Sequence, residues 1–351
     1  MSTVKLSLVF CCYNVSEYLD DIYNWILNQS YSNIEVIFVE DSSTDNTKEK
    51  LYDLFIDPRM RIIENEHNLG LSESRNVGLR NASGEYIGFP DPDDMFALNW
   101  LQEIATAINS YSPEVIITGM REDYENGEKL EFSKDIISKY SGYIQSEFDS
   151  VLVDLEQTML FGYMNNKFYN RELLLANNIT CKKMALKEDF DFNINVFNLV
   201  ENYYILNKPY YFYKKRRNGN TLTAKFVSEY FSIHENSVFL LKELLESKAP
   251  LSAQSKKLLV NRFFRYLLSA IERNTNVKSN LSLAQQVNWV KEILLDKKYN
   301  WFFERKHDLT GKFIFIKPFL KQNLVFVLVI IGYILNITKG KLPVVFAKIK
   351  S

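Results

Sequence analysis

The stretch GEYIGFPDPDDMF, residues 84–96, decides how the rest of the chain is read. Its apolar run, Tyr86–Phe89, predicts a buried strand, and the strand is followed directly by three acids, Asp91, Asp93 and Asp94. Prolines at 90 and 92 remove backbone donors and stiffen the loop, so the acids are held in place. Clustered carboxylates are unfavourable unless a divalent cation compensates them, which favours a site for Mg²⁺ or Mn²⁺. The alternative is an acidic turn that caps the next helix.

Strands and helices alternate around this stretch. Short apolar runs predict strands at 6–12, 34–39, 60–63, 86–89 and 115–118, and helical spacing predicts helices at 17–28, 47–55, 71–80 and 98–111. This alternation predicts an α/β fold with a mostly parallel, Rossmann-like sheet and flanking helices. Because ligands bind at the carboxyl ends of such strands, we expect the polar residues that follow three strands to meet at one edge: Tyr13 and Asn14, Glu40 and Asp41, and Asp91–Asp94.

The rest of the chain shows three different sequence patterns. Residues 121–225 are less regular, with a polar loop or hairpin at 121–134, helices at 149–160 and 187–202, and strands at 203–206 and 210–213. From 228 to 305 the pattern is helical and amphipathic. We therefore expect two halves of one domain, 1–120 and 121–225, then a helical C-terminal region, 226–310, and an apolar, lysine-rich tail, 311–351.

The tail contains an apolar run, Leu324–Leu335, with lysines on both sides. It is shorter than the roughly 20 residues that span a bilayer. A short apolar helix beside lysines suits an element that rests on an anionic membrane surface. The alternatives are a helix buried in the core or in a homo-oligomer interface, and a true membrane span.

Composition excludes several classes of protein. The chain has 42 Lys and Arg against 43 Asp and Glu, so no overall basic field indicates nucleic-acid binding. Three cysteines are too few for a disulfide framework, and with three scattered histidines they give no zinc-binding spacing. This usage suits a reducing, cytoplasmic compartment. The N-terminus lacks a secretory layout and is expected to form the first strand.

Two further groups of charged residues are candidates for chemistry. Glu188 and Asp189 begin a predicted helix, where Asp189 could act as a general base, although acids in a first turn are also favoured by the helix dipole. Arg216 and Arg217 belong to a basic run that could clamp a diphosphate or remain a solvated charge run. Neither GxGxxG nor GxxxxGK[ST] occurs at the positions where a dinucleotide fold or a P-loop enzyme needs it.

Five stretches match one family pattern in order and spacing: LSLVFCCYN (6–14), VEDSSTDNT (39–47), Asn68-Leu69-Gly70 through Arg75-Asn76, GEYIGFPDPDD (84–94) and KFYNRELL (167–174). Together they resemble the family 2 glycosyltransferases with the GT-A fold, of the bacterial cell-surface polysaccharide or teichoic acid type. The resemblance covers about residues 4–225. Cys11 stands where proline is usual, and Glu40 stands where aspartate is usual.

The pair Glu188-Asp189 before a predicted helix also matches the family pattern, and Tyr213–Asn220 matches it loosely. The resemblance implies a role for each matching residue. Asp189 would be the catalytic base, and Asp93 and Asp94 would hold the Mg²⁺ or Mn²⁺ ion. Glu188, Arg216 and Arg217 would lie on the acceptor or diphosphate side. The donor would be bound by a larger set: Tyr13, Asn14, Glu40, Asp41, Asn68, Arg75, Asp91 and Asp93.

The implied activity is a metal-dependent, inverting transfer from a nucleotide diphosphate sugar, expected to be a UDP-sugar. The acceptor would be a hydroxyl of a glycan, a lipid-linked oligosaccharide or a teichoic-acid-like polymer. The expected location is cytoplasmic, at the inner face of the cell membrane. Two alternatives remain: a non-catalytic nucleotide-sugar or glycan-binding module on the same fold, and a nucleotidyltransferase, which would usually carry a Gly-rich basic loop after its first strand.

Overall fold

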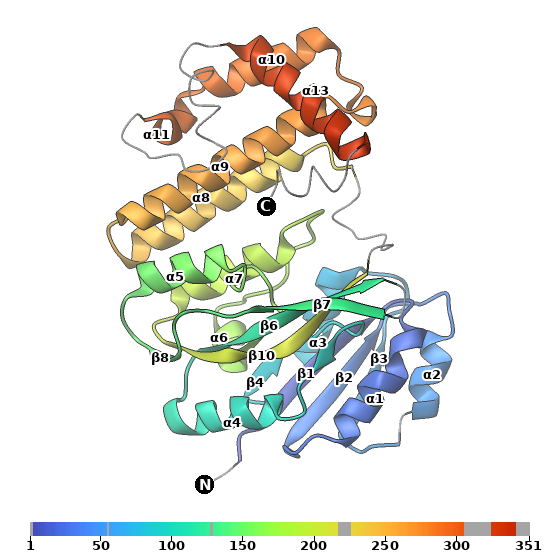
Figure 1. The fold of residues 1–351 in the computed structure, drawn as a ribbon. Helices are drawn as coiled ribbons and strands as arrows, with labels where there is room; N and C mark the ends of the chain where they lie inside the picture. Colours follow the sequence, from blue (N-terminus) through green and yellow to red (C-terminus); the bar gives the residue numbers. More distant parts are fainter. Residues whose placement is uncertain (1–2, 55, 127–128, 217–225, 305–323, 342–351) are drawn as a thin grey trace. The chain divides into compact units, whose positions relative to one another are not determined.

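A computed structural model describes residues 3–54, 56–126, 129–216, 226–304 and 324–341 (Figure 1). The chain divides into two units, Met1–Asn220 and Thr221–Ser351. The described part of the first unit holds a sheet with flanking helices, and that of the second is helical.

The described strands of the first unit form one ten-stranded sheet, ordered β3-β2-β1-β4-β9-β6-β10-β5, with β7 paired to β6 and β8 to β10. Their bounds are β1 (Leu6–Cys12), β2 (Ile34–Glu40), β3 (Met60–Glu64), β4 (Tyr86–Gly88), β5 (Met95–Phe96), β6 (Val115–Asn126), β7 (Lys129–Ile136), β8 (Gly142–Ile144), β9 (Lys167–Asn170) and β10 (Tyr203–Arg216). The helices are α1 (Leu19–Leu27), α2 (Thr47–Leu54), α3 (Leu71–Asn81), α4 (Trp100–Tyr111), α5 (Phe148–Gln157), α6 (Arg171–Ala176) and α7 (Glu188–Leu199).

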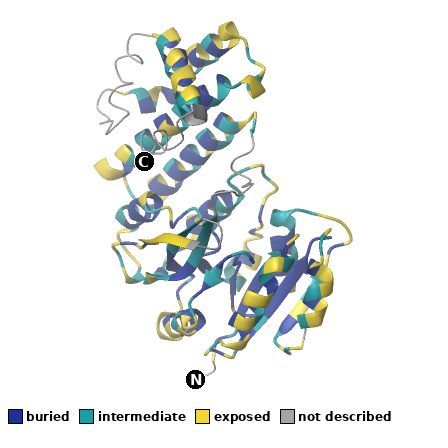
Figure 2. Ribbon diagram, turned by 45° about the vertical axis from the view of Figure 1, so that its right-hand side comes forward, coloured by how far each residue is buried: buried dark blue, intermediate teal, exposed yellow. Residues whose placement is uncertain are grey.

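The parallel strands bring the predicted polar residues to one edge. β1 runs parallel to both β2 and β4, with Leu6 opposite Ile34 and Tyr86. The carboxyl ends of these three strands therefore face the same way, as expected for an α/β sheet. β1 is apolar and almost wholly buried because helices cover the sheet (Figure 2). The α/β prediction is confirmed.

The sheet is mixed, because β9 runs antiparallel to both of its neighbours, β4 and β6. The polar segment predicted as a loop or hairpin is a hairpin of β6 and β7, and β6 continues to Asn126 rather than ending at residue 118. The two strands predicted on either side of Pro209 are one strand, β10. Its register with β6 shifts on both sides of the proline, which has no backbone donor.

An aromatic cluster packs beneath the acid loop. Phe96 lies 5.3 Å from Trp100, 4.9 Å from Trp25 and 5.1 Å from Tyr211 between ring centroids. Buried aromatic pairs in such stacked, tilted and edge contacts contribute about 0.5–1.5 kcal/mol each beyond their buried area. The cluster therefore fixes Tyr211, whose hydroxyl reaches the acid loop.

The second unit contains α8 (Tyr230–Lys248), α9 (Ala253–Asn274), α10 (Leu283–Leu295), α11 (Asn300–Phe303) and α13 (Val325–Lys341). α8 packs beside α9, and Phe263 of α9 stacks on Phe302 of α11 with centroids 4.3 Å apart (Figure 1). This confirms the predicted helical region. Within the described ranges of the chain, no helix combines the length and the hydropathy that crossing a bilayer requires.

All three cysteines are free thiols. Cys12 and Cys181 are buried, and Cys11 is half-buried at the end of β1. Burial raises the pKa of Cys11 to about 12 and also raises that of Cys12 well above its usual value.

Candidate active site

Asp94 is the buried acid of the loop that follows β4. Its carboxylate accepts hydrogen bonds from the Tyr211 hydroxyl at 2.6 Å and from the Lys214 backbone N–H at 3.1 Å. Burial, together with the charges of Asp91 and Asp93, raises the pKa of Asp94 well above its usual value. Asp94 therefore ties the acid loop to β10.

Asp91 and Asp93 are half-buried in the same loop. Asp91 accepts a hydrogen bond from Asn165 Nδ2 at 2.8 Å, and burial raises the pKa of Asp91 to about 6, with the charge of Asp93 adding to the rise and that of Arg75 opposing it. The Asp93 carboxylate has no hydrogen-bond or ion-pair partner among the described residues. Of the three acids, Asp93 is thus the one left open to a ligand.

Arg75 joins two parts of the site that are far apart in sequence. It lies on α3, is 3% exposed, and pairs through Nη1 with Asp189 Oδ1 in the first turn of α7. Its Nη2 lies 3.6 Å from Asp91 Oδ1. The structure therefore brings together Asp189, Arg75 and Asp91, as a carboxylate–guanidinium–carboxylate bridge.

The neighbouring Asn76 supports this bridge. Its side chain donates to the Cys181 carbonyl at 2.9 Å and accepts from the Cys181 N–H at 2.8 Å. Two adjacent residues of α3 thus hold the segment that leads into α7, and Asp189 is positioned by α3 as well as by its own helix. Beside it, burial and the charge of Asp189 raise the pKa of Glu188.

Asp41 follows β2 and is 3% exposed. One of its oxygens accepts from Asn65 Nδ2 and from the Leu69 N–H, both at 2.8 Å, and the other accepts from the Gly70 N–H at 2.8 Å. Asn68 donates to the Asp41 carbonyl at 3.1 Å. Asp41 therefore fixes the loop that precedes α3, where Gly70 has a φ of 85° that disfavours a side chain. Contact of Asp41 or Asn68 with a nucleotide stays a prediction.

Two of the other predicted donor residues, Glu40 and Asn14, form hydrogen bonds to the loop that follows β2. Glu40 accepts from the N–H groups of Ser42 and Ser43, at 3.1 and 2.7 Å, so its longer arm closes the turn after β2. Asn14 Oδ1 accepts from the Thr44 N–H at 2.8 Å. Tyr13 is 47% exposed at the same edge, which leaves its ring available for stacking. Arg216 ends β10, and Arg217 lies outside the described residues.

Lys167 was part of a quoted motif, but its role could not be read from the sequence. It is fully buried, and its ammonium donates to the carbonyls of Leu160 and Tyr163 and to Asn166 Oδ1. Burial lowers the pKa of Lys167 well below its usual value. Asn193 of α7 donates to the carbonyls of Phe161 and Tyr163 at 2.9 and 3.0 Å. The loop 160–166, which presents Asn165 to Asp91, is thus held from two sides.

Asp91, Asp93 and Asp94 are the carboxylates of the acid loop that could contact a divalent cation. In the described part of the chain, no three or more His, Cys, Asp or Glu side chains are placed to hold a metal together. Mg²⁺ is usually held by one or two carboxylates together with substrate phosphates and water, so a protein cage is not required. The open Asp93 carboxylate next to two further acids fits such a shared site.

Comparison with known proteins finds similar sequences among glycosyltransferases. The family model described as "Glycosyl transferase family 2" matches residues 7–183. An uncharacterized glycosyltransferase of Haemophilus influenzae is 30% identical over 197 residues, which cover 53% of this chain and 56% of the relative. Poly(ribitol-phosphate) beta-N-acetylglucosaminyltransferase TarS of Staphylococcus aureus is 23% identical over 299 residues, 83% of this chain and 48% of TarS. The chain thus spans about half the length of these relatives.

A solved structure supports the fold over most of the chain. Residues 1–349 of S. aureus TarS, in complex with UDP-GlcNAc, superpose with a TM-score of 0.67 over 94% of this chain and 90% of that one, at 18% identity. At this identity the likeness shows the fold alone, and it confirms the GT-A prediction.

Proposed function

Because the chain belongs to glycosyl transferase family 2, we propose that it transfers a sugar from a nucleotide diphosphate sugar to an acceptor hydroxyl. The bridge made by Arg75 is the observation that carries this proposal. It sets Asp189, the candidate base, beside the acid loop at the carboxyl edge of the sheet. A proton acceptor next to the donor-side acids is what a single displacement between two bound substrates needs.

The proposed donor is a UDP-sugar. Support comes from the exposed Tyr13 ring at the strand edge, on which a base can stack, and from TarS 1–349, which was solved with UDP-GlcNAc. The proposed acceptor is a glycan, a lipid-linked oligosaccharide or a teichoic-acid-like polymer, since TarS is named for poly(ribitol-phosphate). We place the reaction in the cytoplasm, at the inner face of the cell membrane.

Asp189 is the proposed base. Arg75 takes Oδ1 of Asp189, and the Asp189 carboxylate has no other hydrogen-bond or ion-pair partner in the described part of the chain. Oδ2 is therefore free to accept the acceptor's hydroxyl proton as the oxygen attacks the anomeric carbon. One such displacement inverts the configuration at that carbon. Arg75 keeps the carboxylate oriented during the attack.

Asp93 is the proposed ligand for Mg²⁺ or Mn²⁺, shared with the donor diphosphate. A bound cation would neutralise the charge that develops on the departing diphosphate. Asp94 was predicted as a second ligand, but its carboxylate already accepts two hydrogen bonds from β10. We propose that Asp94 instead fixes the loop that presents Asp93.

Asp189→Asn tests the proposed base. Loss of a general base costs about 10²–10⁴-fold in rate. We expect a loss of transfer in that range while UDP affinity changes less than about threefold, measured by product release and calorimetry. Asp191→Asn, two residues further on α7, is the matched control and should stay active. Normal turnover by Asp189→Asn would sink the assignment.

Ligand-induced stabilisation separates the two alternative functions. A family 2 transferase should be stabilised against heat by UDP with Mn²⁺, and a nucleotidyltransferase by nucleoside triphosphates. A binding module would be stabilised by UDP-sugar without hydrolysing or transferring it over long incubation.

A further inference from the structure

α13 of the second unit is apolar on two opposite faces. One face, with Val325, Leu328 and Val329, is buried where the helix packs against α9 and α10. The other face carries five side chains that are 37–56% exposed: Phe326, Ile330, Tyr333, Ile334 and Ile337. Their spacing of four, three, one and three residues sets them along one side of the helix. We call these five residues the α13 stripe.

Packing on the inner face fixes the direction of the stripe. Gly332 lies so close to α9 that a Cβ there would be 2.8 Å from Ile271 Cγ2 and 3.1 Å from the Ile271 carbonyl. Asn336, one turn further on, is hydrogen-bonded to Asn276 at 3.5 Å. Turning α13 to bury the stripe would break both contacts. The exposure of the stripe is therefore set by the fold of the unit itself.

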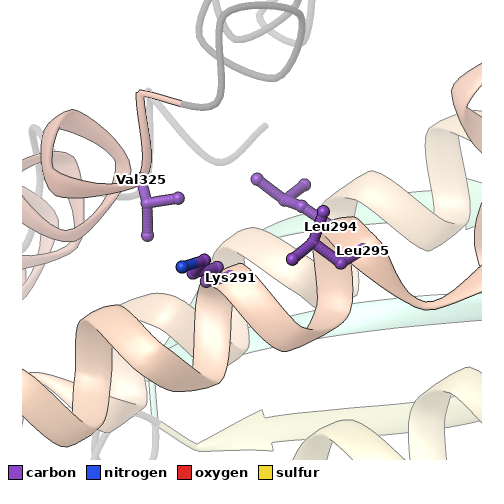
Figure 3. A pocket seen from close by; sticks show the side chains of 4 residues that line it. All are labelled: Lys291, Leu294, Leu295 and Val325. Atoms are coloured by element: carbon purple, nitrogen blue, oxygen red, sulfur yellow. The ribbon is translucent and has the colours of Figure 1, made fainter.

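The sequence of α13 is basic at its C-terminal end. α13 reads VFVLVIIGYILNITKGK, with no acidic residue and with Lys339 and Lys341 in its last turn. At its start, Val325 borders a hollow of about 270 Å³ that is also lined by Lys291, Leu294 and Leu295 of α10 (Figure 3). Leu295 is itself exposed. α13 thus combines an exposed apolar side with a sequence that has no acidic residue and ends in two lysines.

We propose that the α13 stripe rests on an anionic membrane leaflet. At 17 residues, α13 is too short to cross a bilayer. A helix that lies in the interface buries one apolar face, and lysines in its sequence favour an anionic leaflet. A second copy of the chain fits this surface poorly. Two stripes packed together would bring no acidic partner to Lys339 and Lys341 in either direction, since α13 has no acidic residue. Membrane docking through α13 deepens the membrane location given under the proposed function, and its test does not depend on the transfer chemistry.

Vesicle binding by the full chain tests the proposal. Wild type should float with phosphatidylcholine vesicles containing about 30% phosphatidylglycerol and much less with pure phosphatidylcholine. Phe326→Gln/Ile334→Gln, which removes two stripe residues with a good helix former, should lower the partition coefficient at least tenfold. Leu27→Gln/Leu175→Gln changes two exposed apolar residues on other helices and should bind like wild type. Equal flotation of the stripe variant and wild type would overturn the proposal.

Two further measurements keep the proposal open to refutation if the double variant folds poorly. Tyr333→Trp is a mild change on the stripe, and its fluorescence should be quenched by brominated anionic vesicles beyond the wild-type background. No added quenching would overturn the proposal. Sedimentation without vesicles should show the same mass for wild type and the stripe variant. A dimer that the stripe variant dissociates would overturn it in favour of a second copy.

Discussion

Arg75 and Lys167 are both buried cations of the first unit, and they are bonded to different kinds of partner. Arg75 pairs with carboxylates, Asp91 and Asp189, the second of which is 114 residues away. Lys167 donates to neutral oxygens within seven residues of itself. The first cation therefore joins charged groups across the site, and the second shapes one loop.

The kind of partner determines whether each buried cation matters for stability or for catalysis. A buried cation bonded only to carbonyls and an amide has no carboxylate in contact to offset its desolvation. It contributes by donating to buried oxygens that would otherwise lack a hydrogen bond. A buried cation between carboxylates also sets how those acids bind protons. We therefore expect changes at Lys167 to appear mainly as lost stability, and changes at Arg75 mainly as altered catalysis and pH dependence.

The largest effect on stability is expected for Lys167→Met. The variant leaves three buried acceptors short of a donor, and orphaned buried polar groups cost about 1–3 kcal/mol each. The free energy of unfolding should fall by about 3–5 kcal/mol, measured by urea denaturation. Lys182→Met, at an exposed lysine, should change it by less than about 1 kcal/mol. If Lys167→Met also changed the free energy of unfolding by less than about 1 kcal/mol, the stabilising role of Lys167 would be refuted.

Arg75→Met should act chiefly on catalysis. Losing the group that orients the base is expected to lower the transfer rate by about 10²-fold. The pKa of Asp91, about 6 with Arg75 present, should rise further because Arg75 opposes the rise. The acid limb of UDP–Mn²⁺ binding should then move to higher pH, while Arg75→Lys keeps the charge and moves it less. Identical pH profiles for all three proteins would contradict the assigned role.

Stability of the ligand-free protein should fall as pH rises from about 4 to above 6. Folding raises the pKa values of Asp91 and Asp94, so the native state binds more protons than the unfolded state in this window. The contribution of Asp91 is on the order of 1–3 kcal/mol. Glu35, whose pKa is lowered to about 2, loses its stabilising effect only at lower pH. Thermal melts at pH 5 and 7.5 measure the effect, and Asp91→Asn should shrink the difference.

The smallest effect is expected for Asp93→Asn without ligand. Removing one of three clustered charges should leave stability unchanged or raise it by about 1 kcal/mol. The same variant should lose most of the stabilisation given by UDP with Mn²⁺. Full cation-dependent stabilisation in Asp93→Asn would show that another group holds the cation.

The sequence was informative where local pattern and strand topology agree. Apolar runs ending at Asn14, Asp41 and Asp91 led to one sheet edge, because parallel strands present their carboxyl ends together. The motifs around Arg75 and Asp189 matched a family pattern, but nothing local to either residue says that they pair. Such a contact is made by the tertiary fold.

Three residues of the site were missed for a physical reason. Asn165 lies outside every predicted element, Lys167 belongs to the KFYNRELL stretch without an assigned role, and Tyr211 lies in an aromatic run that reads as core. Each acts through burial: Asn165 donates to Asp91, Tyr211 donates to Asp94, and Lys167 caps its loop. Burial of this kind follows from packing between distant segments, which residue spacing does not encode. The extension of β6 into a hairpin was likewise settled by pairing with β10 and β7.

The three sheltered cysteines have a practical consequence. Because burial raises the thiol pKa values of Cys11 and Cys12, the reactive thiolate is scarce near neutral pH. Cys181 is buried and its pKa is raised by burial as well. The native chain should therefore react slowly with maleimides, and a single cysteine introduced on its surface would be labelled selectively. Distance measurements between chosen labels could then be made on the otherwise wild-type chain, without first removing its own thiols.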